Sequence, residues 1–89
     1  MEEDKKRVEL LLKKFSPRIL RLAVNYISFD TTVQELRKYL EEHNDFRPDQ
    51  REMYQTLLKL EGIEVNELVI LSRNIANKGY NLDEIIPLV

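Results

Sequence analysis

Residues 16–28 read SPRILRLAVNYIS, and this stretch decides the fold. Ser16 can cap the free amides at the start of a helix, and Pro17 fits the first helical position, where no amide donor is needed. Apolar side chains then cover most of the helical circumference. The polar side chains form one narrow stripe: Arg18, Arg21, Asn25 and Ser28. We therefore expect a helix from Pro17 to about Ser28 that lies at the centre of the molecule.

Apolar residues on both sides of this stretch recur at steps of three and four, which is the spacing of one helical face. This spacing, together with capping residues, prolines and glycines, predicts further helices. They run from about Glu2 to Phe15, from the Thr32 cap to about His43, from Pro48 to a stop at Gly62, from about Val65 to Lys78, and from Asn81 to Pro87. No stretch alternates apolar and polar residues as a half-buried strand does. The sequence predicts one all-α domain over residues 1–89, a compact bundle of five helices plus a short C-terminal sixth, with no sheet.

Gly62 and Gly79 each follow a predicted helix, where a left-handed glycine commonly ends the helix. If Gly62 is left-handed, it ends its helix in this way, and Gly79 would end the next helix in the same way. The residue after each glycine would then fold back onto the preceding helix: Ile63 on Leu58, and Tyr80 on Ile75.

The composition places the chain among ordinary globular proteins. It has 89 residues, of which 43% are hydrophobic and 34% charged, and its net charge is −2. The absence of cysteine excludes a disulfide scaffold, a thiolate metal site and a cysteine nucleophile. The longest apolar run, residues 68–71, is far shorter than a membrane span, and residues 1–7 are too charged to open a signal peptide. We expect a cytoplasmic protein that does not enter a membrane.

The sequence gives little support to catalysis. The predicted helix that ends at His43 presents four side chains to the core: Val33, Leu36, Tyr39 and Leu40. His43 is the sole histidine, and at the end of this helix its imidazole interacts favourably with the negative helix terminus. Ser16 and Ser28 stand at helix boundaries, so no serine and base form an obvious pair. We expect no enzyme and no cofactor.

Acidic residues surround His43, and they raise the question of a metal site. The nearby carboxylates are Glu41, Glu42, Asp45 and Asp49. They lack the glycine and the ligand spacing of a calcium loop, and His43 has no second histidine with which to form a zinc helix. We expect a solvated acidic turn without a metal.

Charge is distributed unevenly along the chain. Residues 1–21 hold seven basic and four acidic side chains, a net charge of +3, whereas residues 22–89 carry −5. Four cations form what we call the basic corner: Lys13, Lys14, Arg18 and Arg21. Such a ridge suits phosphate or an acidic partner, although an overall pI near 5.4 is far from that of a dedicated nucleic-acid binder.

The two predicted helices that flank Gly62 resemble a generic helix-turn-helix, whose second helix lies in the DNA major groove. The residues that this helix would offer to bases or phosphates are Asn66, Glu67, Ser72, Arg73 and Asn74. One cation before Lys78 is a poor basis for DNA affinity, because phosphate contacts dominate that affinity. A nucleic-acid-associated accessory protein is accordingly the alternative hypothesis and not the leading one. It would use the two helices that flank Gly62 or the basic corner.

The chain ends in an apolar tail, Ile85-Ile86-Pro87-Leu88-Val89. We expect Leu82 and Ile85 to face the core, and Ile86, Leu88 and Val89 to face a second chain, because soluble monomers seldom expose such a patch. The leading hypothesis is a small non-enzymatic helical protein-interaction module, an adaptor or regulatory subunit that binds a protein partner or itself as a homodimer.

Overall fold

The computed structural model describes residues 2–27, 31–43 and 47–87. Ser28, Asp45, Leu88 and Val89, which entered the expectations above, lie outside these ranges. The described residues form six helices and no strand: α1 Glu2–Leu11, α2 Pro17–Tyr26, α3 Val33–Glu42, α4 Pro48–Leu58, α5 Gly62–Lys78 and α6 Leu82–Ile85. The predicted all-α bundle of five helices and a short sixth is confirmed.

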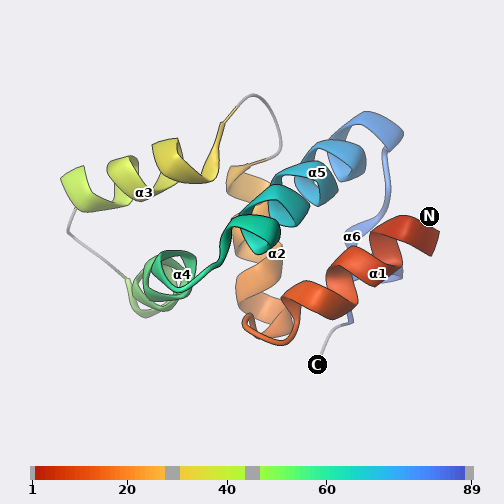
Figure 1. Cartoon of the computed structure of the whole chain (residues 1–89), viewed down its shortest axis with the longest axis horizontal. Coiled ribbons are helices and arrows are strands. Elements are labelled where there is room, and N and C mark those ends of the chain that lie inside the picture. Colours follow the sequence, from red (N-terminus) through yellow and green to blue (C-terminus); the bar gives the residue numbers. More distant parts are fainter. Residues whose placement is uncertain (1, 28–30, 44–46, 88–89) are drawn as a thin grey trace.

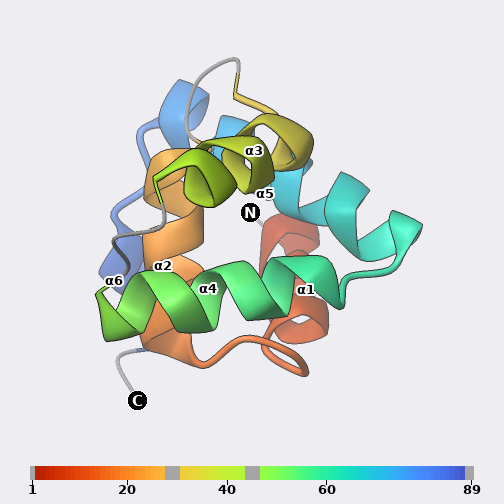
Figure 2. The same ribbon diagram turned by 90° about the vertical axis from the view of Figure 1, so that its left-hand side faces the viewer.

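Helix α2 lies at the centre, as its apolar circumference predicts. It packs against α4 and α5, while α1 lies along α5 and α3 lies on α4 (Figure 1). Its side chains in the core are Ile19, Leu20, Ala23 and Val24, followed by Ile27 at its C-cap. In the view turned by 90°, α3 and α4 lie in front of the upright α2 (Figure 2). Helix α3 is therefore a peripheral helix that rests mainly on α4.

The predicted caps start three of the helices. Ser16 Oγ accepts a hydrogen bond from the amide of Ile19 at 3.3 Å, and Pro17 opens α2. Thr32 Oγ1 accepts from the amide of Glu35 at 3.0 Å and starts α3. The side chain of Asn81 caps α6 by accepting a hydrogen bond from the backbone amide of Asp83 at 3.0 Å.

None of the described helices is long and apolar enough to cross a membrane.

The expected left-handed glycine at position 62 is wrong, whereas that at position 79 is confirmed. Gly79 has a φ of 68° and donates its amide to the Ile75 carbonyl at 3.0 Å. Gly62 is the first residue of α5, and among the described residues Gly79 alone has a positive φ. Helix α4 ends instead with hydrogen bonds between residues three apart, from the amide of Lys59 to the Thr56 carbonyl and from the amide of Leu60 to the Leu57 carbonyl. Helix α5 begins at Gly62, three residues earlier than predicted.

This different turn leaves two aliphatic side chains in solvent. Leu60 is partly buried against the core, whereas Ile63 is not. Leu58 is consequently 54% exposed and Ile63 64% exposed. The expected contact between Leu58 and Ile63 is therefore not a buried clamp. Helix α1 also ends early, at Leu11, although Phe15 beyond its final turn is still buried.

Candidate interaction surfaces

Three cations of the basic corner are paired with carboxylates from distant parts of the chain. Lys14 Nζ lies 2.8 Å from Glu64 Oε1 and donates to the Lys59 carbonyl at 3.1 Å. The pairs of the two arginines are Arg18 with Asp49, and Arg21 with Asp83 at 2.7 Å. Lys13 is exposed and makes no ion pair within the described ranges. The partners lie in three places, namely the start of α5, the start of α4, and α6, so three of the four charges are paired within the chain.

Glu64 links this corner to the start of α5. Its carboxylate accepts hydrogen bonds from the backbone amide of Glu61, at 2.8 Å, and from Lys14. These two bonds hold the pKa of Glu64 below its ordinary value, the amide bond contributing most, although burial opposes them. The hydrogen bond to Glu64 likewise raises the pKa of Lys14. Lys14 therefore connects the segment that follows α1 to the start of α5.

The C-terminal tail closes the core. Ile86 is fully buried and Ile85 nearly so, while Leu82 is half-buried against the same core. Arg21 Nη2 also donates to the Ile86 carbonyl at 2.7 Å, so it fastens both the backbone and Asp83 of the tail. The expectation that Ile86 faces a second chain is wrong, because its side chain fills space within its own chain. The inward positions of Leu82 and Ile85 are confirmed.

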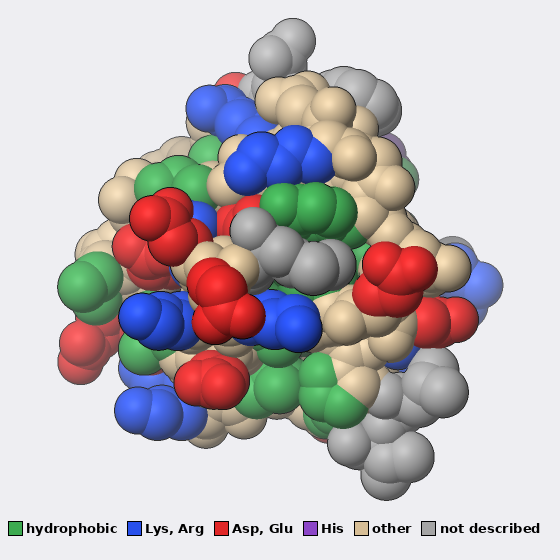
Figure 3. Space-filling view, turned by 90° about the vertical axis from the view of Figure 1, so that its right-hand side faces the viewer, with side chains coloured by type: hydrophobic (Ala, Val, Ile, Leu, Met, Phe, Trp, Pro, Cys, Tyr) green, Lys and Arg blue, Asp and Glu red, His purple; other side chains and the backbone are tan. Residues whose placement is uncertain are grey.

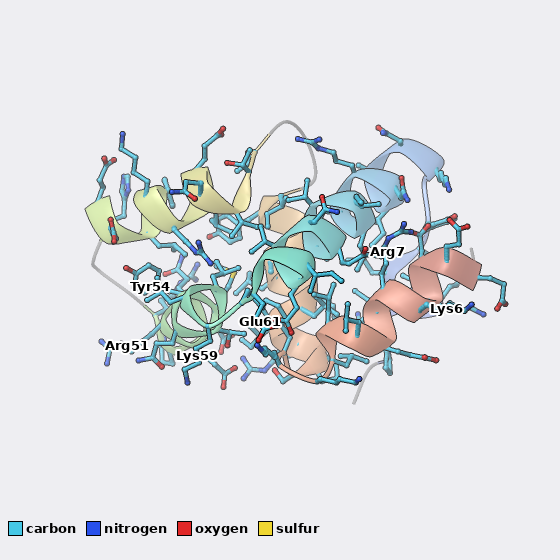
Figure 4. All side chains as sticks on the ribbon, in the orientation of Figure 1. Lys6, Arg7, Arg51, Tyr54, Lys59 and Glu61 are labelled. Carbon is cyan, nitrogen blue, oxygen red and sulfur yellow. The ribbon has the colours of Figure 1, made fainter. Side chains whose placement is uncertain are left out.

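Helix α5 uses three of the five polar residues of the helix-turn-helix interpretation inside the chain, whereas Asn66 and Arg73 are exposed. Ser72 is fully buried and donates to the Leu68 carbonyl at 2.7 Å. Glu67 pairs with Arg7 Nε at 2.7 Å, and the ribbon view with side chains shows Arg7 pointing toward α5 while its neighbour Lys6 points away (Figure 4). Asn74 donates to Asp4 at 3.0 Å. Helix α1 thus covers the side of α5 that carries several residues of the helix-turn-helix interpretation.

Asp4 is the most buried carboxylate of this contact between α1 and α5, with a side chain only 2% exposed. Burial raises its pKa, but hydrogen bonds from Asn74 and Arg7 and the nearby charge of Lys78 outweigh burial and hold the pKa below its ordinary value. The face that contains this contact shows acidic and basic side chains interspersed, with apolar groups scattered between them (Figure 3). Such a mixed charged surface is typical of a solvated face.

A different surface, centred on α3, exposes aromatic rings. Tyr39 was expected in the core but is 46% exposed. The ring of His43 stacks on it, with centroids 4.2 Å apart and planes 24° apart, and Tyr26 lies 6.5 Å away on the other helix, α2. His43 is the C-cap of α3, as predicted, with Nδ1 2.9 Å from the Tyr39 carbonyl. We call Tyr26, Glu35, Tyr39 and His43 the aromatic face.

Open hollows lie beside α3. One of about 310 Å³ is lined by Tyr26, Thr31, Glu35, Leu36 and Tyr39. Another of about 400 Å³ is lined by Leu22, Tyr26, Arg47, Pro48, Asp49 and Gln50. They share Tyr26, whose hydroxyl accepts a hydrogen bond from Gln50 at 3.1 Å. Leu58 helps to line a further hollow of about 440 Å³ with α3 residues that include Glu35, Arg37, Lys38 and Glu41, so Glu35 borders this hollow as well as the first.

The contact of α3 with α4 fixes the aromatic face in place. Arg37 donates to the Leu57 carbonyl, and the Tyr54 hydroxyl donates to Glu41 Oε1 at 3.0 Å. Tyr54 lies on the side of α4 nearer α3 (Figure 4). Burial raises the pKa of Tyr54, and its hydrogen bond to Glu41 adds to the increase. These bonds add to the apolar contacts by which α3 is anchored.

The sequence carried a signal for this face that we did not use. Glu35, Tyr39 and His43 follow one another at steps of four, which places them in one row on a helix. Val33, Leu36 and Leu40 already complete the buried stripe, so Tyr39 falls at its edge.

Within the described ranges, no group of three or more histidine, aspartate or glutamate side chains is placed to hold a metal ion. Comparison of the chain with protein-family models, curated proteins and solved structures finds no match.

Proposed function

We propose that this chain is a small non-enzymatic helical protein-interaction module, an adaptor or regulatory subunit, and that its aromatic face is the binding surface. The observation that carries the proposal is the exposure of Tyr39, held between His43 and Tyr26 with open hollows beside it. Tyrosine is enriched at the energetic centres of protein interfaces, because it buries a large rigid ring and retains a polar tip. A cytoplasmic location is part of the same proposal, since a chain without cysteine needs no oxidising compartment.

The same observations favour a protein partner over nucleic acid. Phosphate binding needs free cations, and Lys14, Arg18 and Arg21 are paired with carboxylates of their own chain. Releasing them for phosphate would break contacts that hold α1, α4 and α6 in place. Self-association through the tail rests on Leu88 and Val89 alone, because Ile86 is buried.

Affinity capture from native lysate with purified variants tests the proposal. We expect Tyr39→Ala to weaken partner binding at least tenfold, because truncation of a central aromatic residue commonly costs about 2 kcal/mol or more. Ile63→Ala is the matched control, since it removes another large exposed hydrophobic side chain, one that lies on α5. Each capture is repeated after nuclease treatment.

Two results would contradict the proposal. One is equal binding by Tyr39→Ala and the wild type. The other is binding that disappears with nuclease, which would instead favour the nucleic-acid alternative. Sedimentation of the same proteins shows whether the captured partner is a second copy, in which case Tyr39→Ala lowers the mass of the complex.

A further inference from the structure

The two faces of the Tyr39 ring have different surroundings. His43, one turn later on α3, stacks on one face at 4.2 Å. Glu35 lies one turn earlier and lines the hollow of about 310 Å³ together with Tyr39. Because His43 occupies one face of the ring, the opposite face is the one that a group entering this hollow would meet.

The hollow combines aromatic walls with a carboxylate. The rings of Tyr26 and Tyr39 have centroids 6.5 Å apart and planes inclined by 45°, so they form two non-parallel walls. Leu36 is buried beneath them and supplies an apolar floor. Among the described residues, no cation or amide pairs with the Glu35 carboxylate. The hollow therefore has, beside two electron-rich ring faces, a carboxylate that makes no ion pair within the described part of the chain.

We propose, on the basis of the function proposed above, that this hollow receives an arginine side chain from a basic segment of the protein partner. A guanidinium group is weakly hydrated, stacks on aromatic rings and pairs with carboxylates, so it matches each component of the hollow. Helix α3 carries three carboxylates, Glu35, Glu41 and Glu42, against the two cations Arg37 and Lys38, and the chain has a net charge of −2. This charge is complementary to a basic segment and attracts it over several ångströms.

The neighbouring hollow gives the rest of such a segment a place to lie. It meets the first hollow at Tyr26 and continues to Leu22 and Pro48. The hydrogen bond from Gln50 holds the Tyr26 ring between the two hollows. An extended segment thus places its arginine beside Tyr39 and an adjacent apolar side chain beside Leu22 and Pro48.

Two ten-residue peptides test this inference on the full chain. One has a central arginine flanked by leucines, and the other has citrulline, which keeps the shape of arginine but has no charge. In a nitrogen-15 NMR titration at low salt we expect the arginine peptide to bind with a Kd below about 1 mM and to shift the amide signals of Tyr26, Glu35 and Tyr39. We expect the citrulline peptide to bind about tenfold more weakly.

Variants separate local recognition from general charge. Tyr39→Leu keeps an apolar side chain but removes the ring, and we expect it to weaken the arginine peptide about two- to fivefold, the size of an exposed cation–π contact. Glu35→Gln should reduce the preference for arginine over citrulline. Glu52→Gln is its matched control, because it removes the same charge from α4, where Glu52 lines a hollow with Pro48, Arg51 and Gln55 that includes neither Tyr26 nor Tyr39.

Several outcomes would overturn the inference: no binding at about 1 mM peptide, equal binding of the two peptides, or an equal effect of Glu35→Gln and Glu52→Gln. Tetramethylammonium is titrated in parallel, and if it shifts the same amides while the arginine peptide does not, the hollow takes a free organic cation instead. If the peptides fail but Tyr39→Ala still abolishes partner capture, this inference is wrong and the proposed interaction function stands.

Discussion

Lys14 and Glu64 lie 50 residues apart in the sequence, yet Lys14 Nζ and Glu64 Oε1 are 2.8 Å apart in the folded chain. The same carboxylate accepts the amide hydrogen of Glu61 and so also begins α5. One side chain therefore both caps a helix and neutralises a cation that the sequence suggested for nucleic-acid binding. This relationship shows that Lys14, one of the four residues of the basic corner, has a structural role.

The capping bond and the ion pair of Glu64 can be separated by two substitutions. Glu64→Ala removes both interactions, and we expect it to lower the free energy of unfolding by about 0.5 to 2 kcal/mol, the usual cost of losing a cap. Glu64→Gln can still accept the Glu61 amide but no longer pairs with the Lys14 charge, so it should cost less. Urea unfolding followed by circular dichroism measures both values. A larger loss for Glu64→Gln than for Glu64→Ala would contradict the capping role.

Acid should weaken the contact between α1 and α5. The pKa of Asp4 is lowered in the folded chain, so the unfolded chain binds its proton more readily. The stability that Asp4 contributes is therefore complete above the ordinary value of 3.8 and is lost as the pH falls below it. Asp4→Asn should make stability less dependent on pH below the ordinary value of 3.8, as measured by urea unfolding at each pH. An unchanged acid dependence in this variant would show that the Asp4 contacts with Arg7 and Asn74 do not contribute.

The two glycines should respond oppositely to alanine. Gly62 opens α5 and has nothing within 4 Å of where a Cβ would stand, so Gly62→Ala should raise stability by about 0.5 to 1 kcal/mol. Gly79 has a φ of 68°, which costs a residue with a Cβ about 1 to 2 kcal/mol, so Gly79→Ala should lower stability. Thermal unfolding of the two variants checks the signs. If Gly62→Ala destabilised the protein by as much as Gly79→Ala, Gly62 would be a left-handed residue after all.

The tail should contribute to stability through Ile86 and to any self-association through residues 88–89. Ile86→Ala leaves a cavity in the core, and we expect a loss of about 2 to 5 kcal/mol without a change in oligomeric state. If the chain forms a dimer through the tail, removal of residues 88–89 should dissociate it. Calorimetry and sedimentation measure the two effects. A small effect of Ile86→Ala on stability would contradict its place in the core.

Local signals in the sequence predicted most of the fold. Ser16 with Pro17, Thr32, Pro48 and Gly79 each fix a helix end through interactions with the next few residues, and each end appears where it was expected. The turn at Gly62 was mispredicted because its geometry depends on distant contacts. Lys14 holds Glu64 at the start of α5, and Leu60 packs into the core ahead of Ile63.

The candidate surfaces were harder to predict than the helices. Whether Arg18 is free or paired depends on Asp49, which lies 31 residues later at the start of α4, after the whole of α3. The position of Tyr39 at the edge of the buried stripe depends on how α3 docks on α4, and apolar spacing alone does not specify that rotation. The row of Glu35, Tyr39 and His43 is visible in the sequence, but its role as an exposed surface becomes visible once α3 is seen at the periphery (Figure 2).

Site-specific photo-crosslinking tests the central claim, that the aromatic face is the binding surface, most directly. A photoreactive phenylalanine derivative replaces Tyr39 in one protein and Ile63 in another, and both are irradiated in native lysate. Both positions are exposed, so each protein should fold. We expect a discrete protein adduct from position 39 that is much stronger than any adduct from position 63 and that survives nuclease. Equal adducts from both positions, or an adduct from position 63 alone, would contradict the assignment of binding to the aromatic face.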